Sequence, residues 1–245
     1  MVGDERSVVR MPTCVSIAVI AWHTASRHGT LTQSSITQKV LRGLAAPTGA
    51  FLSPRVDGSP ADLDKRPPFD PAKAKAVLAE AGYPNGFSVT LDGVNVPWRE
   101  AVCQAMTVML TRVGTRTRLR SSPTNPFFPK LSGATASFIE SGWTPNPDAW
   151  ASLNALLRSW DKSGGGTFNA GRHSNPKLDA LIDSLRVEPD LTRRHAMVGV
   201  ALRIVGDDLP FVPLYRRTLT WAMSKKVTAV QWPNDSPELR WARLR

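Results

Sequence analysis

The stretch FDPAKAKAVLAEAGYPNGF (69–87) carries the clearest structural signals in the chain. Asp70 can accept amide hydrogens left unbonded at a helix start, and Pro71 suits the first helical turn. An apolar stripe at helical spacing follows, made of Ala74, Val77, Leu78 and Ala81. Gly82 tolerates the left-handed backbone of a helix end, and Pro84 cannot continue the helix. The stretch therefore predicts a short helix bounded on both sides.

Strands and helices alternate after this helix. FSVTL (87–91) alternates apolar and polar residues like a half-buried strand. PWREAVCQAMTVMLTRVG (97–114) predicts a second amphipathic helix, and TRTRLR (115–120) follows it as a strand. The apolar face of the second helix comprises Trp98, Val102, Ala105, Met106, Met109 and Val113. This alternation is typical of a layered α/β domain, which is the predicted fold class.

The rest of the chain predicts further elements of the same kinds. In chain order they are a helical face (36–44), a surface connection (46–68), a strand (137–143), a helix (148–158), a glycine- and asparagine-rich loop (161–176), two helices that start at Asn175 and Asp190, apolar strands or crossings (209–215 and 218–224) and a weakly alternating tail (238–245).

The composition fits one large domain or two small ones. The 245 residues are 42% hydrophobic, which is enough for a sizeable core. No apolar run reaches the ~18 residues that a membrane-spanning helix needs. The segment 9–26 is only a weak imitation of a secretory signal, and a buried helix or strand is favoured there.

Cys14 and Cys103 form no metal or redox motif, which favours two buried thiols over a disulfide.

The net charge of +11 makes nucleic acid the first partner to consider. The excess charge is spread thinly, and its densest stretch is TRTRLR, where Arg116, Arg118 and Arg120 would line one face of a strand. A nucleic-acid groove would interleave aromatic residues with the basic groups, and this stretch has none. A solvated strand face is therefore favoured, and we expect no nucleic-acid partner.

Motifs for catalysis and for metal or nucleotide binding are missing from the sequence. GGG (164–166) lacks the lysine of a phosphate-binding loop, and neither a dinucleotide fingerprint nor a nucleophile elbow is present. The four histidines lack ligand spacing; they are His23, His28, His173 and His195. We expect His173, His195 and the adjacent Asp207 and Asp208 to be solvated. The sequence therefore predicts no catalytic residue, no metal and no cofactor.

The stretch SGWTPNPDAW (141–150) places two tryptophans around a stiff polar turn with one carboxylate, Asp148. A buried core does not require that arrangement. Core packing is the favoured interpretation for Trp150.

Three segments together resemble a known family. They are 69–87, the GW…PD loop (142–148) and FNAGRHSNPKLDALID (168–183), and LPFVPLYRR (209–217) supports them. Over about residues 36–245 the chain resembles the C-terminal part of the bacterial extracellular solute-binding proteins of ABC importers, peptide/nickel (family 5) group. The resemblance implies a type II periplasmic-binding-protein fold, in which two α/β lobes close on a ligand, usually a short peptide.

The resemblance also implies partners and ligand contacts. Asp148 would pair with the α-amino group of a peptide or another amine-bearing solute, or cap the helix that follows, or do both. Trp143 would supply an apolar wall and Asn146 an amide contact. Asn169 and Arg172 are further expected contacts, Arg172 for a carboxylate. Loop hydrogen bonding by Asn169 and a solvated Arg172 are the favoured alternatives. A membrane permease would be the protein partner of a monomeric, periplasmic or cell-surface protein.

The chain departs from the family pattern at its start. Family members are much longer, and no convincing signal peptide is present here. We expect an atypical segment over 1–35, an α/β ligand-binding lobe over 36–208, and return strands over 209–245 that would complete an incomplete first lobe. One lobe cannot enclose a ligand, so we expect a truncated binding component that binds weakly alone. A peptide hydrolase on the same fold and a basic nucleic-acid-binding module are the alternative functions.

Overall fold

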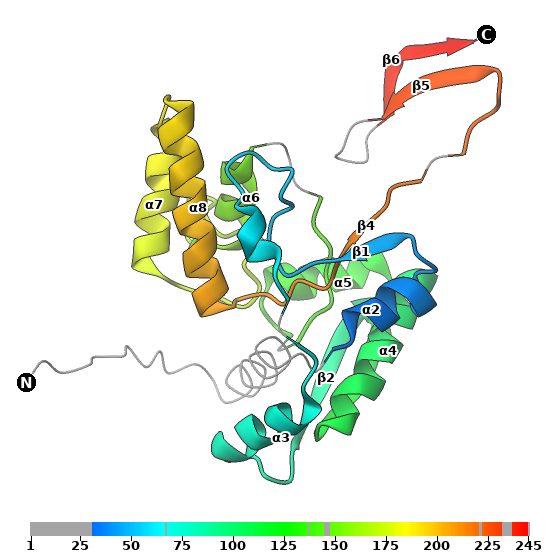
Figure 1. Ribbon diagram of the computed structural model, residues 1–245, viewed down its shortest axis with the longest axis vertical. Coiled ribbons are helices and arrows are strands. Elements are labelled where there is room, and N and C mark those ends of the chain that lie inside the picture. The colour runs from blue at the N-terminus through cyan, green and yellow to red at the C-terminus, as the bar shows by residue number, and fades with distance from the viewer. Residues whose placement is uncertain are drawn as a thin grey trace, which may run out of the picture.

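The computed structural model describes residues 31–66, 68–136, 138–144, 148–220, 222–231 and 237–244. Figure 1 shows a mixed α/β arrangement. The elements are α2 (Gln33–Ser35), the π-helix η1 (Ile36–Val40), β1 (Ala45–Pro47), the 3-10 helix η2 (Ala61–Asp64), α3 (Pro71–Glu80), β2 (Phe87–Val94), α4 (Pro97–Arg112), β3 (Thr115–Ser122), α5 (Thr124–Ser132), α6 (Ala149–Leu156), α7 (Pro176–Val187), α8 (Leu191–Asp208), β4 (Tyr215–Arg217), β5 (Val227–Gln231) and β6 (Pro237–Leu244). Within the described ranges, no helix is both long and apolar enough to cross a bilayer.

Helix α3 is bounded as the sequence predicts. The carboxylate Oδ1 of Asp70 accepts the Lys73 amide at 2.9 Å, and Gly82 has a φ of +89° just beyond the helix end. Ala74 and Leu78 are buried, and Leu78 packs with Phe87 at the start of β2. The helix therefore leads directly into the sheet.

The first core forms around β2, α4 and β3. We call these three elements, together with residues 138–140, the sheet half. The two strands are parallel, with Phe87 opposite Thr115, and α4 is the crossover between them. The buried face of α4 consists of Val102, Cys103, Met106 and Leu110. The predicted strand over 137–143 is reduced to one bridge, between Ile139 and Asp92, on the other side of β2.

The second core forms between α6, α7 and α8. We call these three helices, together with residues 50–56, the helical half. These helices begin near the predicted positions. Their inward residues include Leu153, Leu178, Ile182, Leu185 and Leu202. The prediction that 46–68 is a surface connection was wrong for part of the segment, because Leu52 and Val56 are buried in this core. Leu44, the last residue of the helical face predicted over 36–44, is 51% exposed and lies beyond η1.

Two antiparallel pairs of strands complete the described part of the chain. Strand β4 pairs with β1, with Ala45 opposite Arg217, so the chain returns to the sheet half after α8. Arg216 of β4 also donates to the Asp64 carboxylate at 2.7 Å. Strands β5 and β6 pair with each other, and Figure 1 shows them apart from both halves. The division of the chain into parts 1–35, 36–208 and 209–245 stays a prediction. Most of the first part, including Cys14, lies outside the described residues.

Candidate functional site

Residues 141–148 precede and begin α6, and we call them the cleft loop because the family resemblance predicts that they face a ligand cleft. Trp143 lies in this segment, and contacts with Ser152 and Phe168 orient its side chain. The indole Nε1 donates to the Oγ of Ser152, a buried residue of α6, at 3.0 Å. The ring packs against Phe168, with 5.5 Å between ring centroids and 57° between planes. Trp143 is nevertheless 41% exposed. One aromatic surface is thus oriented by the protein and open to solvent, which suits a ligand wall. Its contact with a ligand stays a prediction.

Asp148 caps helix α6. Its Oδ1 accepts the Trp150 amide at 2.8 Å. Both carboxylate oxygens also accept from Nη2 of Arg194, at 2.9 Å and 2.7 Å. The Asp148 side chain is 51% exposed, so solvent still reaches it. The cap interpretation is confirmed, and pairing with a ligand amine stays a prediction. An incoming ammonium would compete with Arg194 for the same oxygens.

Arg194 was not among the residues that sequence reasoning singled out. Its guanidinium donates to the carbonyl of Leu185 at the end of α7, besides pairing with Asp148 at the start of α6. Arg194 itself lies in the first turns of α8, so this one side chain joins all three helices. Asp148 and Arg194 are 46 residues apart, and no local pattern in the sequence relates them.

Asn169 organises the glycine-rich loop between α6 and α7. It is only 3% exposed. Its Nδ2 donates to the carbonyls of Arg158 at 3.0 Å and His173 at 2.7 Å, and its Oδ1 accepts the His173 amide at 3.0 Å. Loop hydrogen bonding, the favoured alternative, is therefore confirmed. A ligand contact by Asn169 stays a prediction, and both amide hydrogens are already used inside the loop.

Arg172 is exposed, as the favoured alternative expects, and its guanidinium also has two partners within the chain. Its guanidinium carbon lies 4.7 Å from the centroid of the Trp160 ring, and Nη2 donates to the Ser132 carbonyl at 3.4 Å. Its backbone has a φ of +52°, in the left-handed region. Stacking on an aromatic face orients a guanidinium while its edge stays available to a carboxylate. A carboxylate contact stays a prediction.

His173 fixes the end of the same loop to α8, contrary to the prediction that His173 is exposed to solvent. Its Nε2 lies 2.9 Å from Oδ2 of Asp208, and Asn175 Nδ2 donates to that oxygen at 2.7 Å. The His173 side chain is only 15% exposed. Asp208 is 35 residues further along the chain, which is why its role was not predicted. The prediction of an exposed His195 is confirmed.

A buried ion pair holds the base of the cleft loop. Glu140, with only 5% of its side chain exposed, accepts from Nε of Arg99 at 2.8 Å, and Arg99 Nη2 donates to the Glu140 carbonyl at 3.1 Å. Burial raises the pKa of Glu140, and the charge and hydrogen bond of Arg99 oppose that rise. The pair ties the chain just before Trp143 to the first turn of α4.

The predicted site residues are only partly brought together. Trp143 packs on Phe168, the neighbour of Asn169 in the chain, whereas Asp148 and Arg172 contact separate partners. Asn146 lies outside the described residues. Throughout the described ranges, no cluster of three or more His, Cys, Asp or Glu side chains is placed to hold a metal ion. The arrangement is a set of oriented aromatic and charged groups for non-covalent contacts.

Comparison of the sequence with known proteins shows which family this chain belongs to. The family model described as "Bacterial extracellular solute-binding proteins, family 5 Middle" matches residues 32–164, more than half of the chain. The chain belongs to family 5 of the bacterial extracellular solute-binding proteins. The predicted family is therefore confirmed, and its match includes the cleft loop and α6.

Individual relatives agree with this assignment. The glutathione-binding protein GsiB of Escherichia coli K12 is 26% identical over 208 residues, which are 81% of this chain and 40% of GsiB. The chain thus spans about 40% of the length of the curated relatives it matches.

Solved structures confirm the fold. A dipeptide-binding protein from Pseudoalteromonas sp. SM9913, in complex with Met-Leu, matches with a TM-score of 0.79 and 22% identity over 92% of this chain and 45% of that protein. DppA from Helicobacter pylori, in complex with the peptide STSA, matches with a TM-score of 0.74 and 19% identity over 86% of this chain and 41% of DppA. The predicted type II periplasmic-binding-protein fold, represented here by part of its length, is confirmed.

Proposed function

We propose that this chain contributes a ligand-binding lobe to the solute-binding component of an ABC importer. The observation that carries the proposal is Trp143, whose ring is anchored by Ser152 and Phe168 yet remains 41% exposed on the cleft loop. A binding protein needs such a pre-oriented surface, because ordering side chains on binding reduces affinity. Family membership supports a transport role, and we propose no catalytic step.

The proposed ligand is a short peptide or a related solute with an amine and a carboxylate. Asp148 offers a half-exposed carboxylate near one end of the cleft loop, and Arg172 offers a guanidinium stacked on Trp160. These opposite charges suit the two ends of a zwitterionic solute. The names of the relatives, which include a glutathione-binding protein and two peptide complexes, support the same ligand class.

The proposal includes a membrane permease as partner and a periplasmic or cell-surface location, as in an importer. Trp143 and Asp148 are both open to solvent in the described structure, and in the proposal they belong to one wall of the ligand site. Ion pairs that stay hydrated are weak. We therefore expect this chain alone to bind peptides only weakly.

A variant set can test the role of Asp148. Thermal unfolding of the purified chain is measured with and without high concentrations of dipeptides, tripeptides and glutathione. Asp148→Asn keeps a side chain that caps a helix well but removes the charge. Asp190→Asn is the matched control, because Asp190 caps α8 in the same way, through the Arg193 amide at 2.8 Å. Arg194→Gln releases the Asp148 carboxylate from its internal partner.

The proposal predicts a peptide-dependent rise in melting temperature for the wild-type chain and for Asp190→Asn. The rise is lost in Asp148→Asn and increases in Arg194→Gln, because an ammonium no longer competes with a guanidinium. Equal rises in all four proteins would remove Asp148 from the site. No rise with any peptide in the wild-type chain would contradict the ligand class.

A further inference from the structure

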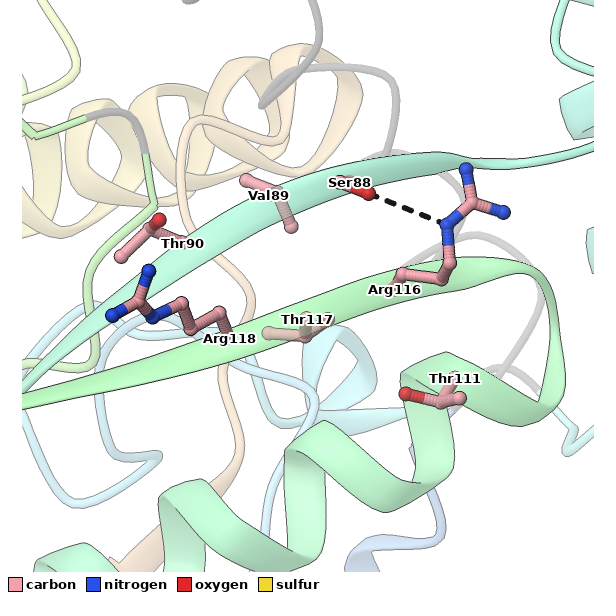
Figure 2. Close-up of a pocket in the computed structure, with 7 residues that line it drawn as sticks. All are labelled: Ser88, Val89, Thr90, Thr111, Arg116, Thr117 and Arg118. Carbon is pink, nitrogen blue, oxygen red and sulfur yellow. Dashed lines mark hydrogen bonds between the residues drawn. The ribbon is translucent and has the colours of Figure 1, made fainter.

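A row of arginines lies on the exposed face of β3, outside the candidate site. Arg116, Arg118 and Arg120 alternate along the strand, and all three are exposed. Their register partners on β2 are Ser88, Thr90 and Asp92. Arg116 and Arg118 line a hollow of about 460 Å³. Figure 2 shows the two side chains, with Arg116 hydrogen-bonded to Ser88. We call Arg116, Arg118 and Arg120 the arginine row.

The end of the row at Arg120 is neutralised within the chain. Nε and Nη2 of Arg120 donate to the two carboxylate oxygens of Asp92, each at 2.6 Å. Lys130 of α5 shares the same carboxylate, with 3.5 Å between Nζ and Oδ1. The Asp92 side chain is only 2% exposed, so this carboxylate is used entirely by these two cations.

The other part of the row keeps its positive charge. Within the described ranges, the acceptors of Arg116 are both neutral: the Ser88 hydroxyl at 3.3 Å and the Asn85 carbonyl at 3.1 Å. For Arg118, the described part of the chain supplies neither a carboxylate nor another acceptor within hydrogen-bonding distance. Two adjacent guanidinium groups therefore have no counter-charge among the residues that the structure describes. Acidic groups from outside the chain are the complementary partner.

The backbone of β3 beside the row is also open. In the described residues, β3 pairs with β2 alone. The Phe87 amide donates to the carbonyl of Gly114, just before β3, at 3.2 Å. Alternate residues of a strand direct their backbone groups to the same side, so even-numbered positions serve β2. Thr117 and Leu119 therefore direct their amides and carbonyls to the free edge.

We propose that an extended acidic segment of a partner protein adds to the free edge of β3 as a further strand. Side chains two residues apart in a strand are about 6.6 Å apart, so alternate acidic residues on the added strand match Arg116 and Arg118. The backbone pairing supplies affinity and the charges supply selectivity. The hollow has no aromatic residue on which a nucleic-acid base would stack.

Charged residues on an edge strand also discourage unwanted pairing. The arginine row does this selectively. It repels a second copy of the same positively charged strand, and it attracts a strand of opposite charge. The same feature thus prevents self-association and specifies the partner.

Fluorescence anisotropy with a labelled peptide of alternating threonine and glutamate tests the proposal on the full chain. One control peptide has the same composition with its glutamates in a single block. A second keeps the alternation but carries N-methyl groups on every second amide, on the edge facing β3. The protein variants are Arg118→Gln, the double variant Arg116→Ala/Arg118→Ala, and the matched control Arg186→Ala, an exposed arginine of α7.

We expect the alternating peptide to bind the wild-type chain and Arg186→Ala equally. Loss of two exposed ion pairs should weaken binding by the double variant about tenfold, and Arg118→Gln should weaken it by less. Both control peptides should bind more weakly than the alternating one. If the blocked or N-methylated peptide binds as well as the alternating one, strand addition is wrong. Absence of peptide binding, or stronger binding of anionic lipid vesicles or single-stranded DNA than of peptide, would also overturn the proposal.

Discussion

The helical half and the sheet half use polar and charged side chains in different ways. In the helical half, Asp148, Asn175 and Asp190 each cap the helix that they precede, through contacts within three residues. In the sheet half, the carboxylates of Asp92 and Glu140 are buried and pair with arginines that are distant in sequence. The helix caps of the helical half are thus local and partly exposed, whereas these two ion pairs of the sheet half are long-range and have a buried carboxylate.

The difference has an energetic consequence. A helix cap contributes about 1 kcal/mol to stability. Removing one partner of a buried ion pair costs about 3–5 kcal/mol, because the other charge stays buried without compensation. The sheet half should therefore respond to loss of a single charge far more strongly than the helical half. Substitutions in each half test this directly.

The largest effect is expected for Arg99→Ala. This change leaves the Glu140 carboxylate, with 5% of its side chain exposed, without its cation. We expect the free energy of unfolding to fall by about 3–5 kcal/mol, measured by chemical denaturation at neutral pH. The matched control is Arg193→Ala in the helical half. The Arg193 side chain is 68% exposed, so its pair with Glu188 should contribute less than about 1 kcal/mol. Equal losses in the two variants would remove the distinction between the halves.

High pH should weaken the sheet half through Cys103. Burial and then the nearby Glu140 charge raise the pKa of its thiol from 9.0 to about 12. Between these values the unfolded chain releases the proton and the folded chain retains it, so stability falls as pH rises from 9 towards 12. Comparing wild type with Cys103→Ala across this range isolates the contribution. If the two pH profiles run parallel, the thiol does not titrate as described.

A smaller effect is expected for the cap of α8. Asp190→Ala removes the acceptor of the Arg193 amide. The free energy of unfolding should fall by about 1 kcal/mol, and Asp190→Asn should restore most of it because asparagine caps equally well. A loss above about 3 kcal/mol, without rescue by asparagine, would show a role for Asp190 beyond capping.

The smallest effect is expected for the pair between Arg203 of α8 and Asp62. Its atoms are 3.0 Å apart, but the two side chains are 56% and 53% exposed. Arg203→Ala should change the free energy of unfolding by less than about 1 kcal/mol, and high salt should erase the difference. A loss comparable with that of Arg99→Ala would mean that exposure does not govern the strength of these pairs.

The same contrast explains what could be predicted from the sequence. Caps and helix stops act within a few residues, so Asp70, Asn175 and Asp190 were identified as helix starts by their neighbours alone. The order of β2, α4 and β3 was predicted from the alternation of residue types along the strands and the apolar face of the helix, but their parallel pairing was not. Leu52 and Val56 were missed because the surrounding prolines and glycines indicate a loop, and a loop can still contribute to a core.

The candidate site was less predictable because its contacts are long-range. Arg99 and Glu140 are separated by 41 residues, and Asp148 and Arg194 by 46. Only the tertiary fold brings each pair together. Trp143 could be singled out from composition, because a tryptophan on a proline-containing turn has no obvious core role. Ser152, which anchors the Trp143 ring, could not be identified from the sequence, since a single serine on a helix has no distinctive pattern around it.

The most direct test of the account is a tryptophan-fluorescence titration with the dipeptide Met-Leu. The chain has eight tryptophans, so Trp143→Phe and the control Trp241→Phe, on the separate β5–β6 pair, are compared with wild type. The account predicts a saturable change in emission for wild type and Trp241→Phe that is lost in Trp143→Phe. The same change in all three proteins, or no change in wild type at any peptide concentration, would contradict the role of the cleft loop in binding.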